Sequence, residues 1–196
     1  MEATECRGGM TEALRTRFDD LIEQTGALQQ GHFQLASGLH SSCFFRCIKL
    51  LENPQAANFL FDALAAQFSE PMDVVLGANE AGSILAFEVA KRLGVRVAIS
   101  RQRNHQYSLI DGFSLAPQQQ VLIVDDITTT GGTAKQLIAI VEAARATPVG
   151  VGLIATKGLF QIDLGCPVKV LISLEGMDAI APETCPLCQQ GIPLTQ

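Results

Sequence analysis

Basic residues are few in this sequence. The chain has 14 lysine and arginine residues against 20 aspartate and glutamate residues, which gives a formal net charge of -6 at pH 7. A protein that binds nucleic acid broadly through the phosphate backbone needs an extended basic surface. The charge balance therefore argues against nucleic acid as a partner.

Long apolar runs and linkers are also missing. The first ten residues, MEATECRGGM, include two glutamates and no apolar stretch, so they resemble neither a secretory signal nor a membrane span. We expect residues 1–10 to be a flexible tail of a cytoplasmic protein that has no membrane partner. The remainder has no low-complexity segment and is long enough for one core, so we expect a single domain over residues 11–196.

A disulfide framework is not indicated either. The chain has six cysteines among 196 residues, whereas disulfide scaffolds are short chains dense in cysteine. Cys185 and Cys188 form the segment CPLC, which is half of a common zinc-ligand pattern. The other cysteines are scattered and supply no obvious second half. A structural zinc and an ordinary carboxyl-terminal turn both stay open for this segment.

What the sequence does contain is an alternation of helices and apolar strands. Helices are predicted over 11–25, from Pro54 behind the capping residue Asn53, over 82–94 and over 133–146. Strands that are apolar throughout are predicted over 72–78, 95–100, 121–126, 149–155 and 168–174. The segment 104–120 interrupts the alternation as either a β-hairpin or a mobile loop. The fold class is therefore α/β, with a parallel sheet covered by helices on both faces.

Two adjacent carboxylates follow a strand in the segment VLIVDDITTTGGTAK, residues 121–135. Like charges at the end of a buried strand repel each other and are costly to desolvate, so a ligand is expected to stabilise Asp125 and Asp126. In parallel sheets, ligands bind beyond the carboxyl ends of the strands. The TTTGG segment offers backbone N–H groups and hydroxyls, with Thr133 as the cap of the next helix, and this arrangement suits a phosphate. The spacing fits neither a P-loop nor a dinucleotide-binding glycine motif.

The segment VLIVDDITTTGGT resembles, at all thirteen positions, the motif that binds phosphoribosyl pyrophosphate (PRPP) in type I phosphoribosyltransferases. Four further segments are similar to the orotate phosphoribosyltransferases of this family: GHFQLASGLHSSCFF, GANEAGSILAFEVAKRLGV, DGF and CPLCQQGIPL. The resemblance implies the type I phosphoribosyltransferase fold, with a small hood formed by the amino- and carboxyl-terminal segments. It also implies a homodimer, Mg²⁺ as cofactor, and transfer of the phosphoribosyl group from PRPP to orotate in pyrimidine biosynthesis.

The same resemblance implies roles for individual residues. Asp125 and Asp126 would bind the ribose hydroxyls, and possible Mg²⁺ ligands are the same two acids. The implied PRPP-binding residues are Asp125, Asp126, Ile127, Thr128, Thr129, Thr130, Gly131, Gly132, Thr133, Gly77, Ala78 and Asn79. The implied orotate-binding residues are Thr129, Lys157 and one of Phe44 and Phe45, in a segment from Ser37 to Phe45 that closes the pocket. Catalytic roles would belong to Asp125, Asp126, Arg101 and Arg103.

The sequence departs from the pattern of the family in three places: at Lys157, in the loop with Arg101 and Arg103, and at Asn79 and Glu80. Lys157 stands where an orotate-binding arginine is expected, and lysine lacks the planar fork that grips a carboxylate at two points. The mobile loop of better-studied relatives carries paired lysines, whereas this chain offers Arg101 and Arg103, which either contact pyrophosphate or are solvated surface charges. Glu80 would repel pyrophosphate unless Mg²⁺ or an arginine lies between them, or unless it points away.

Other interpretations concern the two histidines, Lys157 and the enzymatic role itself. His32 and His40 are more readily explained as packed or surface residues than as general bases, because the ring nitrogen of orotate needs little activation. Lys157 leaves room for a PRPP-dependent enzyme that acts on another base. A non-catalytic PRPP-binding regulator is the alternative from a different class, although no added nucleic-acid-binding segment accompanies the motif.

Overall fold

The computed structural model describes residues 11–35, 38–157, 163–174 and 180–195. The predictions for the tail at 1–10 and for Ser37 lie outside these residues. In the described part of the chain, no helix is both long and apolar enough to cross a membrane.

Six strands form the central sheet, in the order β5-β4-β3-β6-β7-β8. Their bounds are β3 Val74–Ala78, β4 Arg96–Arg103, β5 Gln106–Leu109, β6 Gln120–Thr128, β7 Thr147–Lys157 and β8 Val168–Leu174. Neighbouring strands are parallel except β4 and β5. The central strands β3, β6 and β7 are almost entirely buried, which is why they contain so few polar residues. The predicted parallel sheet is confirmed.

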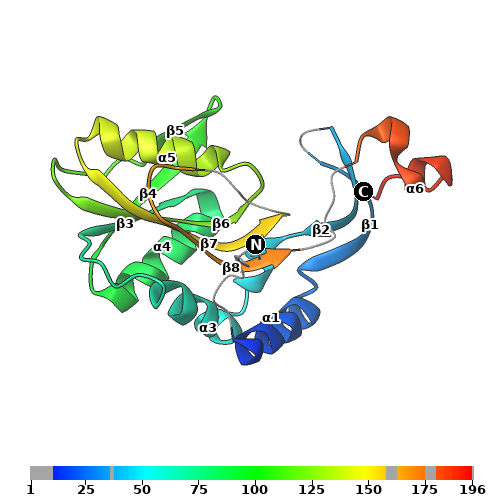
Figure 1. The fold of residues 1–196 in the computed structure, drawn as a ribbon, viewed down its shortest axis with the longest axis horizontal. Helices are drawn as coiled ribbons and strands as arrows, with labels where there is room; N and C mark the ends of the chain where they lie inside the picture. The colour runs from blue at the N-terminus through cyan, green and yellow to red at the C-terminus, as the bar shows by residue number, and fades with distance from the viewer. Residues whose placement is uncertain (1–10, 36–37, 158–162, 175–179, 196) are drawn as a thin grey trace, which may run out of the picture.

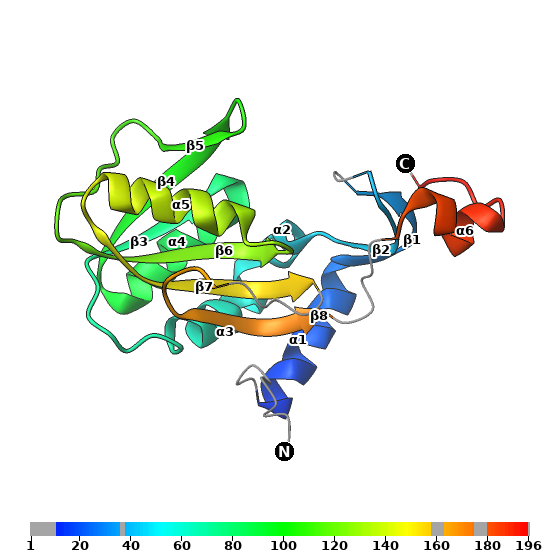
Figure 2. The same cartoon turned by 45° about the horizontal axis from the view of Figure 1, so that its top comes forward.

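Helices cover both faces of this sheet, as predicted (Figures 1 and 2). Their bounds are α1 Glu12–Thr25, α2 Cys47–Leu50, α3 Pro54–Ala65, α4 Asn79–Leu93 and α5 Gly132–Ala143. One hydrophobic core lies between the sheet and α1, α3 and α4, and a second lies between the sheet and α5. Successive residues of β3 alternate between them, with Val75 in the first core and Leu76 in the second.

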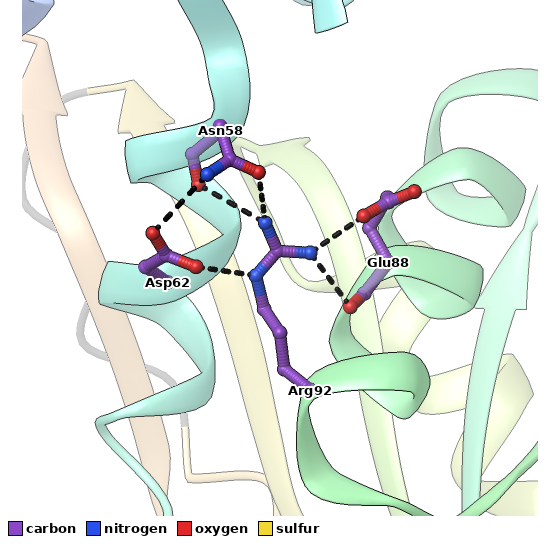
Figure 3. Close-up of polar contacts among 4 residues, drawn as sticks. All are labelled: Asn58, Asp62, Glu88 and Arg92. Atoms are coloured by element: carbon purple, nitrogen blue, oxygen red, sulfur yellow. Dashed lines mark hydrogen bonds and ion pairs between the residues drawn. The ribbon is translucent and has the colours of Figure 1, made fainter. Parts of the chain in front are cut away.

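Arg92 joins α3 to α4 at the edge of the first core. Its Nε donates to Asp62 Oδ1 at 2.5 Å, its Nη1 donates to Glu88 Oε2 at 2.6 Å, and its Nη2 donates to Asn58 (Figure 3). The side chain is only 18% exposed, so these bonds are partly screened from water. The guanidinium fork thus holds the two helices in one relative position.

The predicted hood is present. It consists of the antiparallel strands β1 Leu28–Gln34 and β2 His40–Phe45, together with the 3-10 turn η1 Pro182–Thr184 and the short helix α6 Pro186–Gln189. A bridge between His40 and Ile180 joins the hairpin to the carboxyl-terminal segment. The hood lies on the side toward which the arrowheads of β6, β7 and β8 point (Figures 1 and 2). It therefore stands over the edge of the sheet where ligands are expected.

Several predicted boundaries differ from those of the structure, and one open alternative is decided. The helix expected from Gly82 begins at Asn79, and the strand expected to end at Ser100 continues to Arg103. Of the two alternatives for 104–120, its first part forms a hairpin, because β5 pairs with the end of β4. Asn104 and His105 make the two-residue turn with φ of 50° and 63°, and paired positive φ values match the right-handed twist of the strands.

Candidate active site

An open cleft lies beyond the carboxyl ends of β3 and β6. Its volume is about 460 Å³. The lining residues are Ile48, Ala78, Asn79, Glu80, Ala81, Asp125, Asp126, Ile127 and Thr133. Six of these positions belong to the set predicted to bind PRPP, and they come from segments that are far apart in the chain. The parallel sheet brings them together because β3 and β6 are neighbours and end at the same edge.

Asp125 and Asp126 stand at the end of β6, where the strand leaves the core. Asp125 is 7% exposed. Burial, together with the smaller effect of the negative charge of Asp126, raises its pKa from the ordinary 3.8 to about 8. Burial also raises the pKa of Asp126. The raised pKa values of both acids favour a shared proton on the pair when no cation or donor lies beside it.

Backbone groups orient the two carboxyls. The N–H of Asp126 donates to Asp125 Oδ1 at 3.0 Å, and the N–H of Ile127 donates to Asp126 Oδ1 at 2.8 Å. Each bond uses one oxygen lone pair and fixes the rotamer of its carboxyl. The remaining oxygens are available to accept hydrogen bonds from a ligand.

Two glycines let the neighbouring β3–α4 connection approach these acids closely. A Cβ on Gly77 would lie 2.0 Å from the carbonyl oxygen of Gly82, which only a shift of backbone could relieve. A Cβ on Gly82 would lie 3.2 Å from Asp125 Oδ1. The segment GANEAG therefore needs glycine at both ends so that the first turn of α4 can pack against the strand end and the acid pair.

The loop after the acids leads into the amino terminus of α5. Thr128 Oγ1 accepts a hydrogen bond from the Gly131 N–H at 2.9 Å, and Gly131 adopts a left-handed conformation with φ of 71°. Thr129, Thr130 and Gly132 are exposed. The prediction that Thr133 caps the helix was wrong, since Gly131 is the cap residue and no side chain of the described residues bonds as a cap there. The backbone N–H groups at this helix end are thus directed at a solvent-accessible loop, as phosphate binding requires.

Asn79 ties the cleft to the β4–β5 hairpin. Its Nδ2 donates to Tyr107 Oη at 2.8 Å, and its Oδ1 accepts from the Gln102 N–H at 3.2 Å. The backbone of Asn79 has a φ of 53°, a conformation that asparagine tolerates better than most residues. The hairpin is therefore held beside the mouth of the cleft.

Arginines of the hairpin lie on the same side. Arg101 Nη2 is 3.9 Å from Glu80 Oε1, and both side chains are exposed. At that separation in water the attraction is weak, but the arginine lies where it can offset the charge of Glu80. Arg103 is also exposed on β4, and its role in the site stays a prediction.

The residues predicted for the base lie on β2 and at the end of β7. Phe45 is 4% exposed and packs against Phe18, so it belongs to the core. Phe44 is half-buried, and Lys157 Nζ lies 5.6 Å from the centre of its ring. Burial lowers the pKa of Lys157. Sequence reasoning missed Arg46, whose guanidinium carbon lies 5.4 Å from the same ring. Arg46 directly follows β2 and stands two positions after Phe44, and this proximity was the available signal.

His32 and His40 are buried, at 2% and 6% exposure, and lie beside each other in the hood. Among the described residues that line the cleft, neither histidine is present. Their predicted position as packed residues agrees with this placement.

Comparison with known proteins identifies the family. A model of the phosphoribosyl transferase domain matches residues 49–163. An orotate phosphoribosyltransferase from Pelotomaculum thermopropionicum is 37% identical over 174 residues, which are 88% of this chain and 91% of that protein. Among solved structures, an orotate phosphoribosyltransferase from Aeropyrum pernix aligns with a TM-score of 0.67 and 22% identity over 80% of this chain and 93% of that one.

The same fold also occurs in a phosphoribosyltransferase that is named for a different base. An adenine phosphoribosyltransferase from Thermoanaerobacter pseudethanolicus also aligns, with a TM-score of 0.59 and 21% identity over 67% of this chain and 88% of that one. At such identities, structural similarity describes only the fold. The relatives found by sequence have higher identity to this chain, so they identify its group within the family better than the solved structures do. The chain belongs to the phosphoribosyltransferase family, in which it groups with the orotate phosphoribosyltransferases.

Proposed function

We propose that the protein transfers the 5-phosphoribosyl group of PRPP to orotate, which yields orotidine 5-phosphate and pyrophosphate. The observation that carries this proposal is the acid pair of buried Asp125 and half-buried Asp126, which is followed directly by an exposed loop at the amino terminus of α5. A sugar phosphate satisfies both features at once, because its hydroxyls donate to carboxylates and its phosphate accepts from N–H groups.

The sugar phosphate occupies the β6–α5 connection. The 5-phosphate lies against the loop from Thr129 to Thr133, where N–H groups, threonine hydroxyls and the positive end of α5 combine. The 2- and 3-hydroxyls donate to the free oxygens of Asp125 and Asp126. Hydroxyl donors stabilise the ionised form of a carboxylate, so ribose binding opposes the rise that burial causes in the pKa of Asp125.

The pyrophosphate group points toward the β3–α4 connection. Gly77, Ala78 and Asn79 present backbone there, and Arg101 and Arg103 supply positive charge from the hairpin. The ion pair of Arg101 with Glu80 is long and exposed, so pyrophosphate can replace the carboxylate as its partner. Positive charge near the leaving oxygens lowers the barrier as the bond to the anomeric carbon breaks.

The residues of this cleft suit Mg²⁺ carried in with PRPP. Carboxylate oxygens are the ligands that Mg²⁺ prefers, and Asp125 and Asp126 provide a site whose mutual repulsion a cation relieves. When bound, the ion neutralises part of the charge on pyrophosphate. The acids themselves orient the ribose and favour positive charge on its ring.

Orotate stacks on Phe44. Lys157 and Arg46 both lie against that ring, so an anion stacked there meets two positive charges, which offsets the absence of an arginine at position 157. The ring nitrogen of orotate then attacks the anomeric carbon, a new carbon–nitrogen bond forms, and the carbon–oxygen bond to pyrophosphate breaks. The chain contributes mainly by holding the two substrates in line.

The enzyme acts as a homodimer in the cytoplasm. Ile84 and Phe87, one helical turn apart on α4, are 40% and 57% exposed, which is unusual for large apolar side chains beside an active site. A second copy covers them. The cytoplasmic assignment is supported by the unbridged cysteines Cys47, Cys166, Cys185 and Cys188, which a reducing compartment maintains.

The test is the loss of orotate ultraviolet absorbance when the purified chain is mixed with orotate, PRPP and Mg²⁺. Consumption is expected with the parent protein and not with a double variant, Asp125→Asn with Asp126→Asn. Uracil, adenine and hypoxanthine serve as competing substrates. Turnover of one of these with none of orotate would contradict the proposed base, while PRPP binding without any turnover would contradict the enzymatic role.

A pair of lysine variants tests the base site itself. Lys157→Ala should lower kcat/KM for orotate by about 10- to 100-fold, the usual loss for a hydrogen bond to a charged group. Lys169→Ala, on the exposed surface of β8, is the matched control and should leave kcat/KM unchanged. Equal activities of the two variants would remove Lys157 from the orotate site.

A further inference from the structure

Four potential metal ligands meet in the hood, away from the cleft. His32 lies on β1, His40 lies on β2, and Cys185 and Cys188 come from the carboxyl-terminal segment. One ligand atom of each residue lies within 4.8 Å of every other. The histidines and the cysteines are far apart in the chain, by 153 positions for His32 and Cys185 and by 148 positions for His40 and Cys188. The fold therefore supplies the half of the pattern that the spacing of cysteines left missing.

Four of the six distances between the ligand atoms are close to the edges of a tetrahedron around zinc. With Zn–N near 2.0 Å and Zn–S near 2.3 Å, tetrahedral edges are about 3.3 Å for N···N, about 3.5 Å for N···S and about 3.8 Å for S···S. His32 Nε2 lies 3.5 Å from Cys185 Sγ and 3.6 Å from Cys188 Sγ. His40 Nδ1 lies 3.2 Å from Cys188 Sγ and 2.9 Å from His32 Nε2. Small adjustments bring all four atoms onto one ion.

The second nitrogen of His32 is already engaged in the way that a metal-bound histidine requires. Its Nδ1 lies 2.7 Å from the carbonyl oxygen of Ile192. A carbonyl can only accept, so Nδ1 carries the proton and Nε2 presents its lone pair to the cluster. Carbonyl partners of this kind fix the tautomer and ring orientation of zinc-bound histidines.

Burial and charge also fit. His32 and Cys185 are each 2% exposed and His40 is 6% exposed, while Cys188 lies at the surface. Two thiolates and two neutral imidazoles carry a charge that one Zn²⁺ cancels, so the buried site is neutral overall. Both thiols are unbridged. With four protein ligands there is no open position for substrate, which is the character of a structural site.

The carboxyl-terminal segment needs such a support. Its two helical pieces, η1 and α6, have three and four residues, and neither contains a buried residue. Besides the His40–Ile180 bridge, the segment is held by Thr195, whose N–H donates to the His32 carbonyl at 2.6 Å and whose Oγ1 accepts from the His32 N–H. A Cβ on Gly31 would lie 2.5 Å from Thr195 Oγ1, so glycine permits this approach. Small units without a core of their own commonly depend on a metal.

We propose that His32, His40, Cys185 and Cys188 form a structural zinc site that fastens the carboxyl-terminal segment to the β1–β2 hairpin. The site does not depend on the substrate assigned above. β2 carries both His40 and Phe44. An ion bound to His40 therefore also fixes the position of the strand that carries Phe44.

The first experiment measures zinc in the full-length chain, purified without chelator and with any tag removed. Mass spectrometry of the metal should find about one zinc per chain, as a closed four-ligand site requires. Exchange with Co²⁺ should give the visible bands of tetrahedral cobalt together with thiolate-to-cobalt charge transfer. These measurements use the unaltered protein, so they stand even if a variant folds poorly.

The variants locate the site. Cys188→Ser changes an exposed ligand and should weaken zinc binding by on the order of 100-fold or more in a chelator competition. Cys166→Ser, a half-buried cysteine outside the cluster, is the matched control and should keep its zinc. Native mass spectrometry reports the oxidation state of the Cys185 and Cys188 thiols in the same samples.

Three results would overturn the proposal. The first is a chain that binds no zinc, even after dialysis against zinc. The second is a Cys188→Ser variant that keeps the parent affinity. The third is a native protein that contains a Cys185–Cys188 disulfide in place of a metal.

Discussion

Replacing Asp125 by asparagine should stabilise the ligand-free protein at alkaline pH. Asparagine has the same shape, and its Oδ1 can keep the hydrogen bond from the Asp126 N–H. What the substitution removes is a carboxyl whose charge is opposed by burial and by Asp126. We therefore expect that Asp125 lowers the stability of the ligand-free protein, although it is needed for ligand binding.

The sign and size follow from the raised pKa. A carboxyl with a pKa of about 8 in the folded protein and 3.8 unfolded stabilises the fold when protonated, and that contribution is lost as the pH rises from about 4 to about 8. At about 1.36 kcal/mol for each pKa unit, a change from 3.8 to about 8 sets a ceiling of about 6 kcal/mol. Because asparagine is itself a buried polar group and Asp126 keeps its own charge, we expect about 2–3 kcal/mol above pH 8.

The assay is urea unfolding of the ligand-free protein at several pH values. The chain has no tryptophan and one tyrosine, so far-ultraviolet circular dichroism is a better probe than fluorescence. The gain in the free energy of unfolding for Asp125→Asn should be below about 1 kcal/mol near pH 5 and should grow to its full value near pH 8.5. Asp19→Asn, on the exposed face of α1, is the control and should leave the pH dependence of the parent unchanged.

Two results would refute this reasoning. One is a variant less stable than the parent at every pH, which would mean that the acid is favourably paired in the free protein. The other is a stability difference that does not change with pH, which would mean that Asp125 does not take up a proton in this range.

Three further predictions concern packing and assembly. Gly77→Ala places a Cβ 2.0 Å from the Gly82 carbonyl oxygen, so the free energy of unfolding should fall by about 2–3 kcal/mol or more and PRPP binding should weaken in calorimetry. Arg92→Lys loses the planar fork between α3 and α4 and should cost about 1–2 kcal/mol in urea unfolding, whereas an unchanged midpoint would make this network dispensable. Phe87→Glu puts a charge in the exposed apolar pair with Ile84 and should give a monomer in light scattering; a dimer of parent mass would place the interface elsewhere.

Features that depend on neighbouring residues were readable from the sequence. The apolar strand ending in Asp125 and Asp126, the threonines and glycines after it, and the helix that follows all lie within fifteen residues, and local chemistry decides each of them. The prediction of Thr133 as a helix cap failed at the same place. Gly131 adopts the left-handed conformation and becomes the cap, and backbone geometry of that kind is not specified by the residue pattern alone.

Features that depend on distant residues needed the tertiary structure. Phe44 and Phe45 are adjacent and chemically alike, and only the tertiary structure shows that Phe45 packs against Phe18 in the core while Phe44 contacts Phe33, Arg46 and Lys157. The cluster of histidines and cysteines in the hood likewise depends on residues that are distant in the sequence. His32 and Cys185 carry no shared signal along the chain, because they are 153 positions apart and a ligand pattern is recognised by short spacing.

The sequence by itself thus determined the parallel α/β fold, the acid pair and the phosphate loop, since periodicity and short motifs act over a few residues. The tertiary structure alone decided that Phe45 packs in the core, that Arg46 and Lys157 lie against the ring of Phe44, and that two histidines lie beside the pair of cysteines. The physical reason is that side chains far apart in sequence become neighbours only when the sheet order and the hood place their backbones together.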